Sequence, residues 1–92
     1  HYLLLPARER GRPWPEKYVR RFRPTFGFSL EEAMQAEFVT IVGGNLGVSP
    51  QEERKVRAAG CKVERVAGKN PKETRKMLDA MAADGKRFLT FG

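Results

Sequence analysis

The stretch FVTIVGGNLGVSPQEE, residues 38–53, predicts a strand, a tight turn and a helix in succession. Its first five residues form a nearly continuous apolar run, which is typical of a strand covered on both faces. The glycine-rich residues 43–47 then indicate a turn. Residues 49–52, Ser-Pro-Gln-Glu, form a capping box with proline at the first helical position, so a helix is expected from there to Gly60.

The same alternation of strand and helix extends in both directions from this stretch. A second capping box at 29–32 predicts a helix to about residue 36, and Asn-Pro-Lys-Glu at 70–73 predicts another that ends at Gly85. Strands are expected at 2–5, 61–66 and 88–91. Strands that alternate with helices predict right-handed crossovers and a parallel sheet. We therefore expect one α/β domain over residues 1–92, a three-layer Rossmann-like or flavodoxin-like fold with an open parallel sheet of about four strands and helices on both faces.

Composition excludes several classes of protein. No run approaches the roughly 18 apolar residues that a membrane-spanning helix needs. The only cysteine, Cys61, cannot form an internal disulfide, and with the only histidine, His1, it cannot build a metal site. No Ser–His–acid set is available, and no two carboxylates pair in an apolar setting. The sequence therefore predicts a protein that is not an enzyme and that holds no cofactor.

The positive charge is concentrated near the beginning of the chain. The net charge is +7, and residues 7–24 hold seven basic residues against two acidic ones. Prolines in this part disfavour a long helix or a central strand, so we expect residues 7–28 to form a basic, proline-rich excursion with one short helix over 15–22. Trp14, Tyr18 and Phe22 are four residues apart and would share one face of that helix.

Two interpretations of this segment remain open. The aromatic residues can pin the excursion to the core while the basic residues keep it soluble. Alternatively, the segment forms a basic surface with aromatic platforms that binds an anionic polymer, nucleic acid included. The residues of that surface are Arg12, Trp14, Lys17, Tyr18, Arg20, Arg21 and Arg23.

The glycine-rich turn also has two interpretations. It lies at the carboxyl end of a strand and before a helix, where open parallel sheets bind ligands. Glu64 follows Gly43 by twenty-one residues, near the place where an acid meets the ribose in a dinucleotide site. However, the glycines follow the pattern G-G-x-x-G and not G-x-G-x-x-G. The turn is therefore either a tight connection or a phosphate- or nucleotide-binding loop.

Residues 38–80 resemble the type 2 cell-wall-binding repeat. The resemblance is carried by Val-Thr-Ile-Val-Gly-Gly at 39–44, Gly-Val-Ser at 47–49, Glu53, and Gly-Cys-Lys-Val-Glu-Arg-Val-Ala-Gly at 60–68, with Glu73 and Thr74 also at matching places. Two positions depart from the pattern, because Pro71 stands where the family has an arginine and Lys72 where it has a tyrosine.

The resemblance implies a noncatalytic module that anchors exported bacterial proteins through an anionic wall polymer, usually with three copies packed together. As partners it implies the polymer or peptidoglycan, further copies of the module or a wall-remodelling enzyme on the same parent chain, and other chains of a homo-oligomer. It implies a location outside the cytoplasm, in the cell envelope. Because the chain begins at His1 and not at methionine, we expect a fragment or processed product whose export signal is not visible.

Under this hypothesis the ligand lies at the carboxyl edge of the sheet. Arg65 would end a strand there, and arginine forks and helix-start amides suit phosphate or carboxylate groups. The ligand-binding residues would be Arg65, Lys69, Asn70 and Lys72 with Gly43, Gly44 and Asn45. Alternatively, Arg65 forms an ion pair with a helix carboxylate such as Glu73. The competing functions are a nucleic-acid-binding domain using residues 7–24 and a small nucleotide-binding domain using the glycine turn.

Overall fold

The structure is an open parallel sheet with helices on both faces. The computed structural model describes residues 1–6, 15–45 and 47–89. In this part the strands are β1 (Tyr2–Leu4), β2 (Thr25–Gly27), β3 (Phe38–Val42) and β4 (Lys62–Val66), all parallel, in the spatial order β2-β1-β3-β4. The helices are α1 (Glu16–Phe22), α2 (Leu30–Ala33), α3 (Pro50–Ala58) and α4 (Pro71–Asp84). The predicted α/β class and parallel sheet are thus confirmed.

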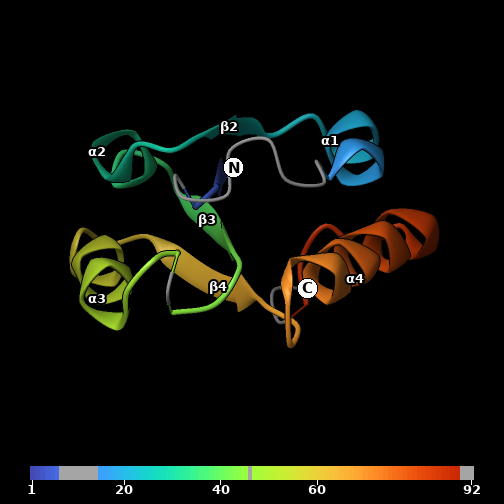
Figure 1. Cartoon of the computed structure of the whole chain (residues 1–92). Helices are drawn as coiled ribbons and strands as arrows, with labels where there is room; N and C mark the ends of the chain where they lie inside the picture. Colours follow the sequence, from blue (N-terminus) through green and yellow to red (C-terminus); the bar gives the residue numbers. More distant parts are fainter. Residues whose placement is uncertain (7–14, 46, 90–92) are drawn as a thin grey trace.

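The sheet separates two helical layers, each with its own apolar cluster (Figure 1). Successive residues of a strand point to opposite faces, so alternate residues of β1, β3 and β4 serve different clusters. Tyr2, Leu4, Val39, Ile41 and Val63 pack on the side of α2 and α3. On the side of α1 and α4 the buried cluster consists of Leu3, Leu5, Val42, Val66, Tyr18, Leu78, Met81 and Ala82. This division decides which helices each strand side chain can reach.

Side-chain caps begin three of the helices at the predicted residues. The Ser29, Ser49 and Asn70 side chains accept hydrogen bonds from backbone amides three residues later, at 3.2, 3.1 and 2.9 Å. At α3 the box is reciprocal, because the Ser49 amide also donates to Glu52 Oε1 at 2.9 Å. The far end of α4 is closed by Gly85, whose φ of 70° lies in the left-handed region that glycine adopts without strain.

The fourth strand of the sheet lies where the sequence did not predict one. β2 falls inside the expected excursion at 7–28 and pairs with β1, with the Thr25 amide donating to His1 O at 3.0 Å and the Leu5 amide to Gly27 O at 2.8 Å. Three residues are too few to show a period of two, and at the sheet edge Thr25 and Phe26 stay exposed, so no apolar alternation marks them.

The strand predicted at 88–91 was wrong for its described residues, Phe88 and Leu89. The Phe88 ring instead stacks on Phe38, with 5.0 Å between centroids, and meets the His1 ring at 4.7 Å. The Leu89 amide donates to Glu64 Oε2 at 2.7 Å. Contacts with side chains of the sheet therefore hold this segment. Such contacts cannot be predicted from the pattern of apolar residues within the segment itself. Residues 90 and 91 lie outside the described residues.

The close approach of the β4–α4 loop to α4 gives a test of the fold at Gly68. A Cβ atom there would lie 2.5 Å from Glu73 Cβ and 2.9 Å from the Thr74 backbone nitrogen. We expect Gly68→Ala to lower the free energy of unfolding by about 1–3 kcal/mol, because backbone atoms must move. Urea unfolding measures this. Gly44→Ala is the control, since a Cβ there meets nothing within 4 Å; equal losses in both variants would contradict the packing described.

Candidate functional site

The loops after β3 and β4 meet at the carboxyl edge of the sheet. Between them lies a pocket of about 260 Å³. Of the residues predicted to bind an anion, the structure brings Gly43, Gly44, Asn45, Lys69 and Asn70 together around this edge pocket. Adjacent parallel strands end at the same edge, so β3 and β4 place their following loops side by side. Lys72, also predicted, is exposed on the first turn of α4 and does not line the pocket.

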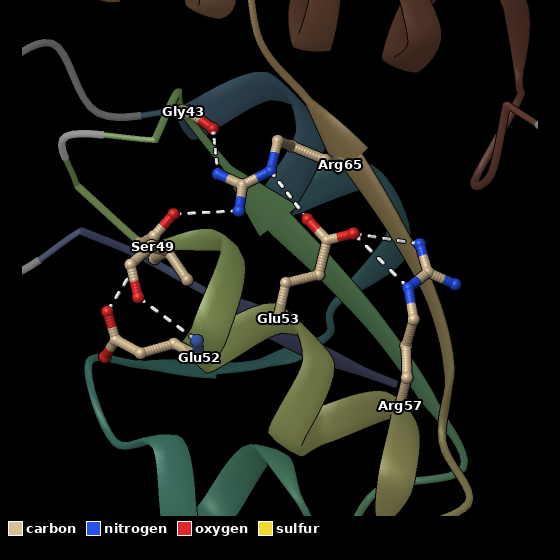
Figure 2. A network of polar contacts seen from close by, with 7 residues as sticks. Gly43, Ser49, Glu52, Glu53, Arg57 and Arg65 are labelled. Carbon is tan, nitrogen blue, oxygen red and sulfur yellow. Dashed lines mark hydrogen bonds and ion pairs between the residues drawn. The ribbon is translucent and has the colours of Figure 1, made fainter.

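The guanidinium group of Arg65 holds the glycine turn in place (Figure 2). Its Nη1 donates to the Gly43 carbonyl and its Nη2 to the Val48 carbonyl, both at 2.8 Å. Its Nε donates to Glu53 Oε1, also at 2.8 Å, and the side chain is only 16% exposed. The guanidinium thus binds both ends of the turn and the first turns of α3. We call this set of contacts the Arg65 clamp.

The clamp shows how Arg65 is used inside the protein. Three of its N–H groups bind protein oxygens, so Arg65 acts as a positioning residue for the glycine turn, and it is not among the residues that line the edge pocket. The expected ion pair exists, but its carboxylate is Glu53 of α3 and not Glu73 of α4. Arg65 follows Val63 by two residues and therefore shares the α3 face of the sheet. Side chains alternate between the two faces of β4, and α3 covers the face that carries Arg65. These two facts together would have identified Glu53 as the partner of Arg65.

Glu53 is held ionised by two arginines. Partial burial raises the pKa of its carboxyl, but the hydrogen bonds and charges of Arg65 and Arg57 outweigh this effect, and the pKa falls below the usual 4.5. Arg57 Nη2 lies 3.1 Å from Glu53 Oε2 (Figure 2). Because the folded-state pKa is lowered, ionised Glu53 stabilises the fold above pH 4.5, and this stabilisation is lost as the pH falls through the lowered value.

Some polar groups at the edge pocket have internal partners and others do not. The Asn70 side chain caps α4, and Thr74 Oγ1 accepts a hydrogen bond from the Gly68 amide at 2.9 Å. The backbone amides of Gly44, Asn45 and Lys69 have no hydrogen-bond acceptor among the described residues. Lys69 and these unused amides of the glycine turn and of the loop before α4 together make a setting that favours an anion.

The point where the strand order reverses lies one strand away, between β1 and β3. There Gly47 packs so closely on Pro6 that a Cβ at Gly47 would clash with Pro6 Cβ. Glu64, the acid considered for a nucleotide site, is 5% exposed, and its Oε2 accepts the Leu89 amide. It is thus turned into the protein, and the structure offers it no route to a ribose beside the glycine turn.

A second candidate surface is a basic groove between α1 and α4. Four of the predicted basic residues, Lys17, Arg20, Arg21 and Arg23, line a groove of about 570 Å³ together with Asp79, Ala82 and Ala83. All four are exposed. Arg20 Nη2 pairs with Glu16 Oε1 at 2.7 Å, one turn away on α1.

The aromatic part of the predicted basic surface is not available on α1. Tyr18 is fully buried, and its hydroxyl donates to the Arg87 carbonyl at 2.5 Å. Burial is the main cause that raises the pKa of Tyr18 to about 12. Its ring packs edge-to-face on Phe22 at 4.9 Å, so the prediction of Tyr18 as an exposed platform was wrong. The spacing of four residues correctly predicted that Tyr18 and Phe22 share one face of α1. It could not show that this face points toward the core. Arg12 and Trp14 lie outside the described residues.

Comparisons with known proteins suggest no function, so the function is inferred from the geometry of the structure. No family model, no curated protein and no solved structure matches this chain. Over residues 1–6, 15–45 and 47–89, no helix is long and apolar enough to cross a bilayer. Within the same residues, no group of three or more His, Cys, Asp or Glu side chains is placed to hold a metal ion.

The contacts of the Arg65 clamp predict that removing Arg65 destabilises the fold more than removing Arg57, the other arginine bound to Glu53. Arg65→Met leaves the Gly43 and Val48 carbonyls without their donor and leaves the partly buried Glu53 with Arg57 as its remaining arginine, so we expect a loss of about 2–4 kcal/mol in the free energy of unfolding. Arg57→Met removes a pair whose arginine is 51% exposed and should lose less than about 1 kcal/mol. Urea unfolding at neutral pH compares them; equal small losses would show that Arg65 does not hold the turn.

Proposed function

We propose that this chain is a noncatalytic module that binds an anionic polymer of the bacterial cell envelope and thereby anchors a larger exported protein. The observation that carries the proposal is the edge pocket, where Lys69 lies among amides that have no acceptor in the described chain. Such a site suits one phosphate or carboxylate group. Among the described residues that line the pocket, no side chain is a nucleophile paired with a base.

The Arg65 clamp supports binding indirectly. A loop that must be ordered when a ligand arrives weakens binding by the entropy lost. Here both ends of the glycine turn are already fixed by hydrogen bonds of 2.8 Å. The two ends of the turn that carries the Gly44 and Asn45 amides are therefore held in place before an anion enters.

One such pocket gives modest affinity. A single lysine with a few amides at the protein surface contributes a limited free energy in water and salt. Several modules on one parent chain, or a homo-oligomer, would raise the effective concentration of sites along a repeating polymer. We therefore propose further copies of the module, or a wall-remodelling enzyme on the same parent chain, as its partners outside the cytoplasm.

A nucleic-acid-binding domain is the second candidate, and the basic groove favours it. Four exposed cations beside one carboxylate, Asp79, would attract any polyanion. Binding of single strands also relies on aromatic platforms for the bases. Burial of Tyr18 removes that element from α1, so the groove supports a contact with charge more than a contact with bases.

A charge reversal at the edge pocket tests the proposed function. We expect Lys69→Glu to weaken binding of a purified ribitol-phosphate wall polymer about fivefold, because one attraction becomes a repulsion. Isothermal titration calorimetry at fixed ionic strength gives the affinity. Lys55→Glu is the matched control, since Lys55 is exposed on α3 on the opposite face of the sheet and the net charge changes equally.

Two outcomes would overturn the proposed function. The first is the absence of saturable binding to both the ribitol-phosphate polymer and peptidoglycan. The second is an equal affinity of Lys69→Glu and Lys55→Glu for the polymer, which would remove the edge pocket from the binding surface.

A further inference from the structure

Helix α4 joins the two candidate surfaces. Its first turn borders the edge pocket through Pro71 and Thr74, and its last turns border the basic groove through Ala82 and Ala83. The helix has 14 residues and is therefore about 21 Å long. The two hollows thus lie at opposite ends of one rigid element, in the same helical layer as α1 (Figure 1).

The flank of α4 between the two hollows is basic. Lys72, Arg75, Asp79 and Ala83 are three or four residues apart and form one stripe along the helix. Because Asp79 and Ala83 line the groove, this stripe faces the side on which α1 lies. Lys72 is exposed, and Arg75 makes only a long ion pair with Asp79, 3.9 Å between Nε and Oδ2.

The acidic residues of α4 lie mostly elsewhere on the helix. With about 100° of rotation per residue, Glu73 and Asp84 are more than about 100° around the axis from the middle of the stripe. Glu73 is also the partner of Lys76, with 3.9 Å between Oε1 and Nζ. Asp79 is therefore the acidic residue of the stripe itself.

We propose that these residues form one cationic track that binds a single linear anionic chain from the edge pocket to the basic groove. The track consists of Lys69, Lys72 and Arg75, followed by Lys17, Arg20 and Arg21 of α1. This inference rests on the proposed function and extends it. It assigns the ligand as an extended polymer longer than about 20 Å, the length of α4, and not as an isolated phosphate or carboxylate.

The surface of the track favours an acidic glycan or polyol phosphate over nucleic acid. The described residues that line the two hollows include no aromatic ring, and the uncharged lining residues of the groove are Ala82 and Ala83. A base would find only arginine planes to stack on among these described residues, whereas a chain that presents only charges and hydroxyls needs no aromatic platform. Arginine and lysine along a line instead match charges repeated along the polymer.

A length series with paired double variants tests the track. The probes are oligogalacturonates with contour lengths of about 10 Å and about 30 Å, below and above the length of α4. We expect the long probe to bind more tightly per chain and with a steeper salt dependence. The double variant Lys72→Glu/Arg75→Glu should weaken the long probe about tenfold and leave the short probe unchanged.

The control for this experiment reverses two charges off the track. Arg54 and Lys55 are exposed on α3, across the sheet, so Arg54→Glu/Lys55→Glu gives the same net charge without touching the track. Thermal melting checks that each variant folds. If the Arg75 change unfolds the chain, Lys72→Glu alone carries the test, because Lys72 is exposed at the start of α4.

The outcomes separate the track from the proposed function. If neither probe binds an unaltered chain that does bind the ribitol-phosphate polymer, the track is wrong while the proposed function stands; if that polymer and peptidoglycan do not bind either, the proposed function fails and the track fails with it. If both probes bind equally, or if the two double variants behave alike, the track is wrong while binding at the edge pocket stands. If oligothymidylate of the same length binds more tightly than the long oligogalacturonate, the assignment to a polymer without bases is wrong.

Discussion

The three hydrogen bonds of the Arg65 guanidinium are the constraint on which the carboxyl edge of the sheet depends. They tie the Gly43 and Val48 carbonyls at the two ends of the glycine turn to β4, and they tie β4 to Glu53 on α3. A glycine-rich turn has many conformations when it is free. In the folded chain the Gly47 and Val48 amides bind the Gly44 carbonyl within the turn, and the Arg65 contacts fix the two ends. The same contacts support the function proposed for this edge, in which Arg65 holds the turn in place and Lys69 with the neighbouring amides binds an anion.

The layered architecture then distributes charge over the molecule. On the α3 face of β4, Arg65 is paired with Glu53 of α3, and the two side chains are only 16% and 22% exposed. On the opposite face, α1 buries Tyr18 and turns its basic residues outward, next to α4. Both α1 and α4 follow a strand and run back across the same face, so the basic side chains of two segments far apart in sequence become neighbours. The order in which the strands and helices are connected therefore brings these basic side chains together.

Local signals in the sequence were sufficient for most of the fold. Capping residues Ser29, Ser49 and Asn70 were assigned correctly, as were the buried strands that became β3 and β4, because each depends on residues within a few positions. The errors lie where distant contacts decide. β2 is a three-residue edge strand defined by its pairing with β1, and Phe88 is held by Phe38 and His1. At the candidate site, sequence located Lys69 beside the glycine turn but could not identify Glu53 as the partner of Arg65 or the inward side of Tyr18.

Mapping of amide chemical shifts during titration with the ribitol-phosphate polymer tests the central claim most directly, because it reports the binding surface without altering the chain. The account predicts that the largest shifts fall on Gly44, Asn45 and Lys69 and continue along the stripe of α4 to α1. Shifts centred on α2 and α3, on the other face of the sheet, would contradict it, and so would a spectrum that does not change at saturating polymer.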